Sequence, residues 1–157
     1  MKIVIGSDKA GFALKSSVAA HLTSKTHQFT DIGPENDKER VSFVEIADNL
    51  CASIQKNKAE LGILVCGTGM GMSLAANKHL GIYAAVVESI YSAKMSRLIN
   101  NANVLCMGGF IVGPTLANEI VDVFLATEYL HNFEQWRRDF LNEQLVALKK
   151  IESINFK

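Results

Sequence analysis

The stretch of sequence that decides the fold is LGILVCGTGMGMSLAANK, residues 61–78. Residues 61–65 form a short apolar run that is typical of a buried strand, and residues 74–78 have the composition of a helix. The glycine-rich turn between them exposes backbone N–H groups at a helix N-terminus, where anions bind well. Cys66 ends the strand, so the segment predicts a thiol beside an anion-binding turn.

A thiol in this position can act as a nucleophile or as a base, and the residues alone leave both roles open. A helix N-terminus stabilises a thiolate, and N–H groups aimed at developing negative charge stabilise oxyanions. Buried cysteines are also often inert packing residues. The place of Cys66 at a strand tip favours a functional role. Cys51, on the apolar side of a helix, and Cys106, within a strand, are predicted to pack.

The glycines of this turn invite a nucleotide-binding interpretation that their spacing does not support. Gly67 and Gly69 begin like the G-x-G-x-x-G fingerprint, and Glu88 lies about 20 residues further on. The third glycine, Gly71, comes one residue too early, however, and no G-K-[ST] follows to make a P-loop. Three alternating glycines with Thr68 between them exceed what a tight turn requires. The pattern therefore favours an anion site over a nucleotide site.

Strand-like and helix-like stretches alternate outward from this segment along the whole chain. We expect strands at residues 2–6, 28–33, 61–65, 81–87 and 103–107. We expect helices at residues 11–24, 43–54, 89–98, 114–127 and 132–151, and one directly after the glycine turn. The pattern predicts one α/β domain over residues 1–157: a three-layer, doubly wound, Rossmann-like sheet of five parallel strands with helices on both faces. The extra C-terminal helix adds little to this sheet, so we expect it at a subunit interface.

Composition excludes several classes of partner. Lys and Arg together number 16, as do Asp and Glu, so no basic excess favours nucleic acid or an anionic membrane. No apolar run approaches the roughly 20 residues of a membrane span. The three cysteines are widely spaced and make no disulfide framework, and the N-terminus has no signal-peptide pattern. We therefore expect a cytoplasmic protein.

Ligands of doubly wound sheets bind at the carboxyl ends of the strands. Asp8 and Lys9 follow the first strand there, although Asp8 also fits a helix N-cap or a turn. Arg40, Arg137 and Arg138 have, without further context, the pattern of a solvated face. None of the four histidines has a partner at metal-ligand spacing, so we expect surface roles for them and no metal site.

Residues 66–78 closely resemble ribose-5-phosphate isomerase B, a family that also contains the two subunits of galactose-6-phosphate isomerase. The likeness continues through residues 5–15, 101–105 and 113–129, so it covers nearly the whole chain. The resemblance implies an aldose–ketose isomerase of the pentose phosphate type that acts on a small sugar phosphate without metal, nucleotide or other cofactor. It also implies dimers or tetramers whose active sites are shared between subunits.

The resemblance assigns roles to individual residues. In this family the cysteine that matches Cys66 is the base that moves a proton between C1 and C2 of the open-chain sugar phosphate, and Thr68 assists. Asp8 matches an aspartate that contacts sugar hydroxyls, Asn100 a substrate-contacting asparagine, and Arg137 an arginine that binds the phosphate. The turn holds the enediolate oxygens, which implicates Gly67, Gly69, Met70, Gly71 and Ser73 in substrate binding.

The departures from the family pattern fall on the site. Lys9 stands where the family usually has histidine; it can bind phosphate as a point charge but cannot shuttle protons near neutral pH. Ile99 stands where the family has the histidine that opens the sugar ring. Residues 42–44, Ser-Phe-Val, replace Asp-Tyr-Pro, and Phe133 replaces one of the phosphate-binding arginines.

These departures leave three functions open. The leading one is an isomerase that favours sugars needing no help to open, such as a four-carbon ketose phosphate whose esterified terminal oxygen cannot close a furanose. Another is one subunit of a hetero-oligomeric isomerase, in which a paralogous chain brings the imidazole that Ile99 lacks. A non-catalytic sugar-phosphate-binding protein is the third, and the retained Cys66, Thr68 and Asp8 argue against it. A nucleotide-binding oxidoreductase fits less well than any of these. For the leading function we expect a homodimer or tetramer.

Overall fold

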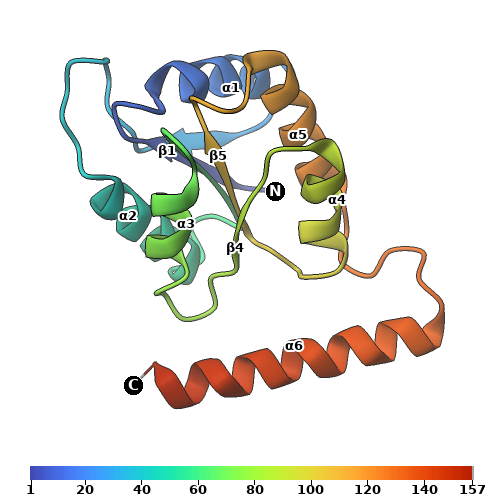
Figure 1. Cartoon of the computed structure of the whole chain (residues 1–157). Helices are drawn as coiled ribbons and strands as arrows, with labels where there is room; N and C mark the ends of the chain where they lie inside the picture. Colours follow the sequence, from blue (N-terminus) through green and yellow to red (C-terminus); the bar gives the residue numbers. More distant parts are fainter. Residues whose placement is uncertain (157) are drawn as a thin grey trace.

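The computed structural model describes residues 1–156 as an alternation of strands and helices (Figure 1). The strands are β1 (Ile3–Ser7), β2 (Phe29–Asp31), β3 (Leu61–Cys66), β4 (Ala84–Val86) and β5 (Val104–Gly108). The helices are α1 (Phe12–Ser24), α2 (Phe43–Gln55), α3 (Met70–Ala76), α4 (Ile90–Leu98), α5 (Pro114–Ala126) and α6 (Gln135–Asn155).

The five strands form one parallel sheet in the order β2-β1-β3-β5-β4. At its centre β3 pairs with β1 from Ile3↔Leu61 to Ser7↔Val65, and with β5 as far as Cys66↔Gly108. This register brings the carboxyl ends of β1, β3 and β5 side by side. The chain leaves β1 for β2 on one side and then returns to β3 on the other. The strand order therefore reverses between β1 and β3, where open α/β sheets bind ligands. The predicted five-stranded doubly wound fold is confirmed.

Helices cover both faces of the sheet. Figure 1 shows α1, α4 and α5 on one side and α2 and α3 on the other. Ile5 and Phe124 are fully buried in the first core, and Leu50 and Met72 in the second. Side chains alternate between the faces of a strand, and Cys66 belongs to the second core. The thiol therefore lies on the same side of the sheet as α3.

The fourth strand and the last helix differ most from their predicted bounds. The fourth strand begins at Ala84 rather than at residue 81, because the side chain of Asn103 hydrogen-bonds the backbone groups just before Ala84. Its Oδ1 accepts a hydrogen bond from the N–H of Tyr83 and its Nδ2 donates to the carbonyl of Gly81, both at 2.8 Å. The last helix runs over residues 135–155 instead of 132–151, because Asn132 adopts a φ of 56° and cannot lie within a helix.

Helix α6 runs along the amino end of the sheet and touches the rest of the chain at only a few points (Figure 1). It buries none of its residues. Two oxygens of Glu152 accept hydrogen bonds from the N–H of Gly81 at 2.6 Å and from the hydroxyl of Tyr83 at 3.1 Å. Near its start, the hydroxyl of Tyr129 donates to the carbonyl of Leu141 at 3.2 Å. Within residues 1–156, no helix has the length and apolar character needed to cross a membrane.

Candidate active site

Three turns meet at the carboxyl edge of the sheet, and they pack backbone against backbone. The N–H of Asp8 donates to the carbonyl of Val65 at 3.3 Å, and the N–H of Gly109 donates to the carbonyl of Cys66 at 2.7 Å. A Cβ on Gly11 would lie 2.2 Å from the carbonyl oxygen of Val65, so only glycine fits there. The turns after β1, β3 and β5 are thereby held against each other as one surface.

Cys66 stands at the centre of this surface. Its side chain is buried, with 5% of the residue exposed, and the backbone N–H of Gly69 donates to its Sγ at 3.1 Å. Gly69 adopts a φ of 76°, which turns this N–H back toward the sulfur at the start of α3. Within residues 1–156, the N–H of the half-buried Gly71 forms no hydrogen bond, so the turn keeps a free backbone donor at the start of α3.

The other residues of the glycine turn differ in what they can offer a ligand. Thr68 is exposed, and its Oγ1 accepts a hydrogen bond from the N–H of Met70 at 3.4 Å. Met70 is itself 53% exposed. Ser73 faces the sheet instead, because its hydroxyl donates to the carbonyl of Ala84 at 3.3 Å and accepts from the side chain of Asn77. Thr68 and Met70 thus face outward with the turn, whereas the Ser73 side chain supports α3 from behind.

Asp8 and Lys9 lie beside this turn, on a cleft of about 600 Å³. The cleft is lined by Asp8, Lys9, Ala10, Arg40, Val41 and Phe110. One carboxylate oxygen of Asp8 accepts the N–H of Gly11 at 2.9 Å, so Asp8 does stabilise the turn before α1, and the same side chain still borders the cleft. The structure therefore brings Asp8, Lys9 and the Cys66 turn together at one edge.

The remaining two thiols are structural. Cys51 and Cys106 have no exposed surface, as the sequence predicted. Burial, with a smaller contribution from the charge of Asp48, raises the pKa of Cys51 to about 12. Burial also raises the pKa of Cys106 well above its ordinary value. Both are neutral thiols at physiological pH, which leaves Cys66 as the thiol that a ligand at the carboxyl edge can reach.

Asn100 and Arg137 lie at the opposite edge. A helix that follows a parallel strand runs back toward the amino end of the sheet, so α4 carries Asn100 away from Cys66. Asn100 lines a second cavity of about 500 Å³, between the body and α6. The chain enters α6 beside the end of α4, where the N–H of Leu130 donates to the carbonyl of Leu98 at 3.0 Å. The Arg137 guanidinium stacks 4.0 Å from the ring centre of Phe133 in this region.

Two histidines are less exposed than the sequence suggested. His21 forms a hydrogen bond with Asp122, and His79 forms one with Asp48, each at 2.7 Å. Both imidazoles are partly buried. The ring of His79 also bonds the last carbonyls of α3, so it ties the helix after the glycine turn to α2. Within residues 1–156, no three His, Cys, Asp or Glu side chains lie close enough together to hold a metal ion.

Two aromatic residues lie beside the turn: Phe43, noted from the sequence only as a departure from the family pattern, and Phe110, which was not singled out. A Cβ on Gly67 would lie 2.8 Å from the ring of Phe110, and a Cβ on Gly71 would lie 3.0 Å from the ring of Phe43. Each ring therefore rests on a glycine of the turn and forms a wall beside it. The signal for Phe110 was its place directly after Gly108-Gly109 at the end of the fifth strand.

Comparison with known proteins agrees with this geometry. The family model described as Ribose/Galactose Isomerase matches residues 3–140. The 4-deoxy-4-sulfo-D-erythrose isomerase of Clostridium sp. (strain MSTE9) is 46% identical over 141 residues, which cover 90% of this chain and 89% of that protein. The D-erythrulose-4-phosphate isomerase of Pectobacterium atrosepticum is 38% identical over 129 residues, covering 82% and 85%. The structure of Clostridium thermocellum ribose-5-phosphate isomerase B superimposes with a TM-score of 0.89 at 35% identity and covers 98% of both chains.

The fold and these matches define an aldose–ketose isomerase. More particularly, the chain belongs to the Ribose/Galactose Isomerase family. The resemblance first seen in residues 66–78 is thereby confirmed.

Proposed function

We propose that this protein interconverts the aldose and ketose forms of a four-carbon sugar with a terminal sulfonate or phosphate, and that Cys66 is the base. The thiolate takes the proton from the hydroxyl-bearing carbon next to the carbonyl, and an enediolate forms. The thiol then returns a proton to the former carbonyl carbon, while the hydroxyl proton moves between the two oxygens. Atoms and charges balance without a cofactor.

The observation that carries the proposal is the arrangement around the Cys66 sulfur. The N–H of Gly69 donates to the sulfur at 3.1 Å, and the free N–H of Gly71 follows at the start of α3. Donors held in place beside a base stabilise the oxyanion that proton removal creates. Asp8, with one oxygen already fixed by a backbone N–H, can accept a bond from a sugar hydroxyl with the other.

The proposed four-carbon length of the substrate rests on Ile99. In the family pattern a histidine at this position opens the sugar ring, and isoleucine has no proton to donate. A four-carbon aldose whose C4 carries a sulfonate or a phosphate ester has no free C4 hydroxyl, so it cannot close a furanose and needs no ring opening. The names of the Clostridium and Pectobacterium relatives, one a sulfo-erythrose isomerase and the other an erythrulose-phosphate isomerase, support this substrate class.

A second copy of the chain completes the site in this proposal. Asn100 and Arg137 match substrate-contacting residues of the family, yet they lie at the amino edge, away from Cys66. In a symmetric dimer the amino edge of one subunit can meet the carboxyl edge of the other. A paralogous chain could take the same place in a hetero-oligomer, which is the alternative retained for this function.

The test is a substrate panel with the purified protein. We expect turnover of 4-deoxy-4-sulfo-D-erythrose or D-erythrulose 4-phosphate, with kcat/KM about 100-fold or more above that for ribose 5-phosphate, which must first open its ring. Product formation is followed by NMR. Comparable or better turnover of ribose 5-phosphate would contradict the four-carbon assignment. Inactivity on the whole panel, with activity gained only on adding a paralogous chain, would establish the hetero-oligomer instead.

A further inference from the structure

The cleft beside the Cys66 turn contains two cations without partners. Lys9 and Arg40 both line it, and within residues 1–156 neither forms an ion pair or a side-chain hydrogen bond. The nearby Lys15 is different, because it is buried and bonded to Asp31 at 2.8 Å. Among the described residues 1–156, Asp8 is the one carboxylate that lines the cleft, and the N–H of Gly11 already occupies one of its oxygens. The cleft therefore has a positive excess.

The cleft and the Cys66 turn share a wall. Phe110 lines the cleft, and its ring lies against Gly67, one residue after Cys66. The N–H of Phe110 donates to the carbonyl of Gly67 at 3.0 Å, which fixes the wall to the turn. Phe110 is 77% exposed, so the part of its ring that faces away from Gly67 can contact a ligand. The cleft therefore begins directly beside the turn that carries the sulfur.

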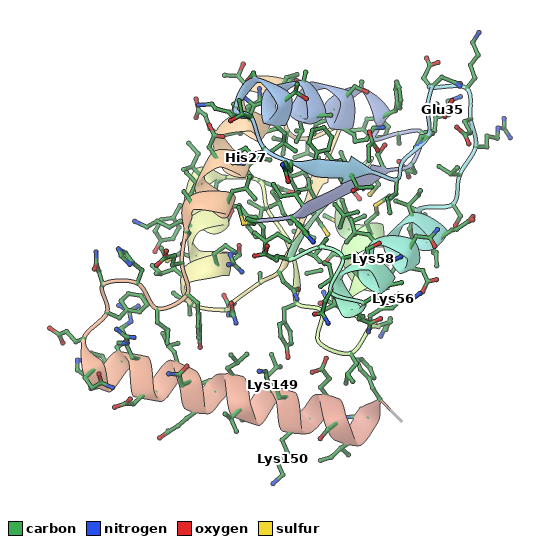
Figure 2. All side chains as sticks on the ribbon, turned by 180° about the vertical axis from the view of Figure 1, so that it is seen from behind. His27, Glu35, Lys56, Lys58, Lys149 and Lys150 are labelled. Carbon is green, nitrogen blue, oxygen red and sulfur yellow. The ribbon has the colours of Figure 1, made fainter. Side chains whose placement is uncertain are left out.

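Lys9 and Arg40 come from two different turns that the fold brings together. Lys9 follows β1 in the turn that is locked against β3, whereas Arg40 ends the long loop between β2 and α2. Figure 2, seen from behind, shows this loop extending from the body at Glu35. The buried Lys15 anchors the start of the loop, because its ammonium also donates to the carbonyl of Pro34 at 3.1 Å.

We propose that Lys9 and Arg40 bind the anionic end of the substrate, with its carbonyl end at Cys66. This inference rests on the proposed function and names the residues that select the terminal anion. An ammonium point charge and a guanidinium fork together suit the three oxygens of a sulfonate or phosphate. The chain thus supplies two anion-binding cations from the same subunit that supplies the base, where the family pattern has histidine at position 9 and an arginine at position 133.

The test compares Lys9→Met and Arg40→Met on substrates with and without the terminal anion. We expect KM for the four-carbon sulfonate or phosphate to rise about 10- to 100-fold in each variant, with kcat changed less than about 3-fold. The same variants should leave kcat/KM unchanged for 4-deoxyerythrose, which has a methyl group in place of the charged terminus. Lys9→Arg should restore most of the lost affinity. Comparing the sulfonate with the phosphate decides which of the two anions this cleft prefers.

Two controls separate this inference from the proposed function. Lys58→Met removes the same charge from an exposed lysine at the amino end of β3, labelled in Figure 2, and should leave KM unchanged. Calorimetry with erythronate 4-phosphate, whose carboxylate replaces the enediolate, measures binding without turnover. We expect its dissociation constant to rise about 10- to 100-fold in Lys9→Met, and that of unphosphorylated erythronate to stay the same.

Unchanged binding of erythronate 4-phosphate in both variants would overturn the inference even if the wild-type protein turns over the four-carbon sugars. An equal loss for the ligands with and without the terminal anion would overturn it as well, because it would mean that the variants disturb the turn and not an anion site. Absence of turnover by the wild-type protein, with the calorimetric difference intact, would instead overturn the proposed function alone. Circular dichroism and the unfolding midpoint confirm that each variant is folded.

Discussion

The two edges of the sheet are built in opposite ways. At the carboxyl edge three turns touch through their backbones, Gly11 leaves no room for a side chain, and Cys66 is 5% exposed. At the amino edge α6 buries none of its residues, and Trp136 and Phe140 remain 66% and 53% exposed. The packing of the carboxyl edge is made entirely by contacts within one chain. An exposed apolar helix is typical of a surface that a partner covers. This contrast supports the proposal that one subunit supplies the base and a second copy completes its site.

The largest effect is expected from Cys66→Ser. The serine hydroxyl stays protonated at neutral pH, so kcat should fall about 1,000-fold or more. The unfolding free energy should change by less than about 1.5 kcal/mol, because the volume is nearly kept. Steady-state kinetics and urea unfolding measure the two quantities. Cys51→Ala is the matched control: it removes a buried sulfur and lowers stability, and it should leave kcat unchanged. Substantial activity of Cys66→Ser would mean that Cys66 is not the base.

Gly11→Ala tests how tightly the carboxyl edge is packed. The added Cβ would lie 2.2 Å from the carbonyl oxygen of Val65, and neither backbone segment can shift without breaking the contact between β1 and β3. We expect a loss of about 3 kcal/mol or more in unfolding free energy. Gly113→Ala is the control, since a Cβ there meets nothing within 4 Å, and should change stability by less than about 0.5 kcal/mol. Equal stabilities for the two variants would mean that the turns are not packed as described.

Arg137→Met tests whether the amino edge of one subunit serves the carboxyl edge of another. We expect kcat/KM to fall about 10- to 100-fold without loss of stability, because the guanidinium rests on Phe133 at the surface. Mixing the inactive Cys66→Ser chain with the weakened Arg137→Met chain should then give roughly a quarter of the wild-type activity, since half of the dimers are mixed and each contains one intact site. Mixtures no more active than their components would show that each subunit works with its own residues.

The smallest effect is expected where α6 meets the body. Burial, followed by the hydrogen bond and the charge of Glu152, raises the pKa of Tyr83 to about 12. In Glu152→Gln the charge is lost and burial remains, so this pKa should fall while staying above its ordinary value of about 10. Absorbance of the ionised phenol against pH measures the shift. Stability should change by less than about 1 kcal/mol. An unchanged pKa would mean that Glu152 does not hold α6 at this position.

Much of the fold was predictable because its signals are local. The apolar runs and the glycine turn of residues 61–78 fixed the type and sequence of the elements, and Pro114 marked the start of α5 correctly. The start of β4 was wrong because the side chain of Asn103, some 20 residues away in the sequence, bonds the backbone around Tyr83. The position of β4 outside β5 was also beyond reach, because strand order depends on which hydrophobic faces meet after the chain has folded.

The site was predictable to a lesser extent. The segment around Cys66 is continuous in the sequence, so its thiol and its N–H groups were found together. Lys9 and Arg40 share a cleft only because the loop before α2 returns to the end of β1, and no local pattern reports that. The separation of Asn100 from Cys66 was available in principle, since a helix after a parallel strand always returns to the amino edge.

The central claim, that Cys66 moves a proton between two carbons of the substrate, is tested most directly in heavy water. The four-carbon sulfonate or phosphate is incubated with enzyme in D₂O, and NMR follows deuterium at the two carbons. We predict that the wild-type protein introduces deuterium from solvent at the carbon that receives the proton. We predict that Cys66→Ser, folded and still able to bind erythronate 4-phosphate, introduces it about 1,000-fold more slowly or not at all. Deuterium introduced at an undiminished rate by Cys66→Ser would contradict the claim.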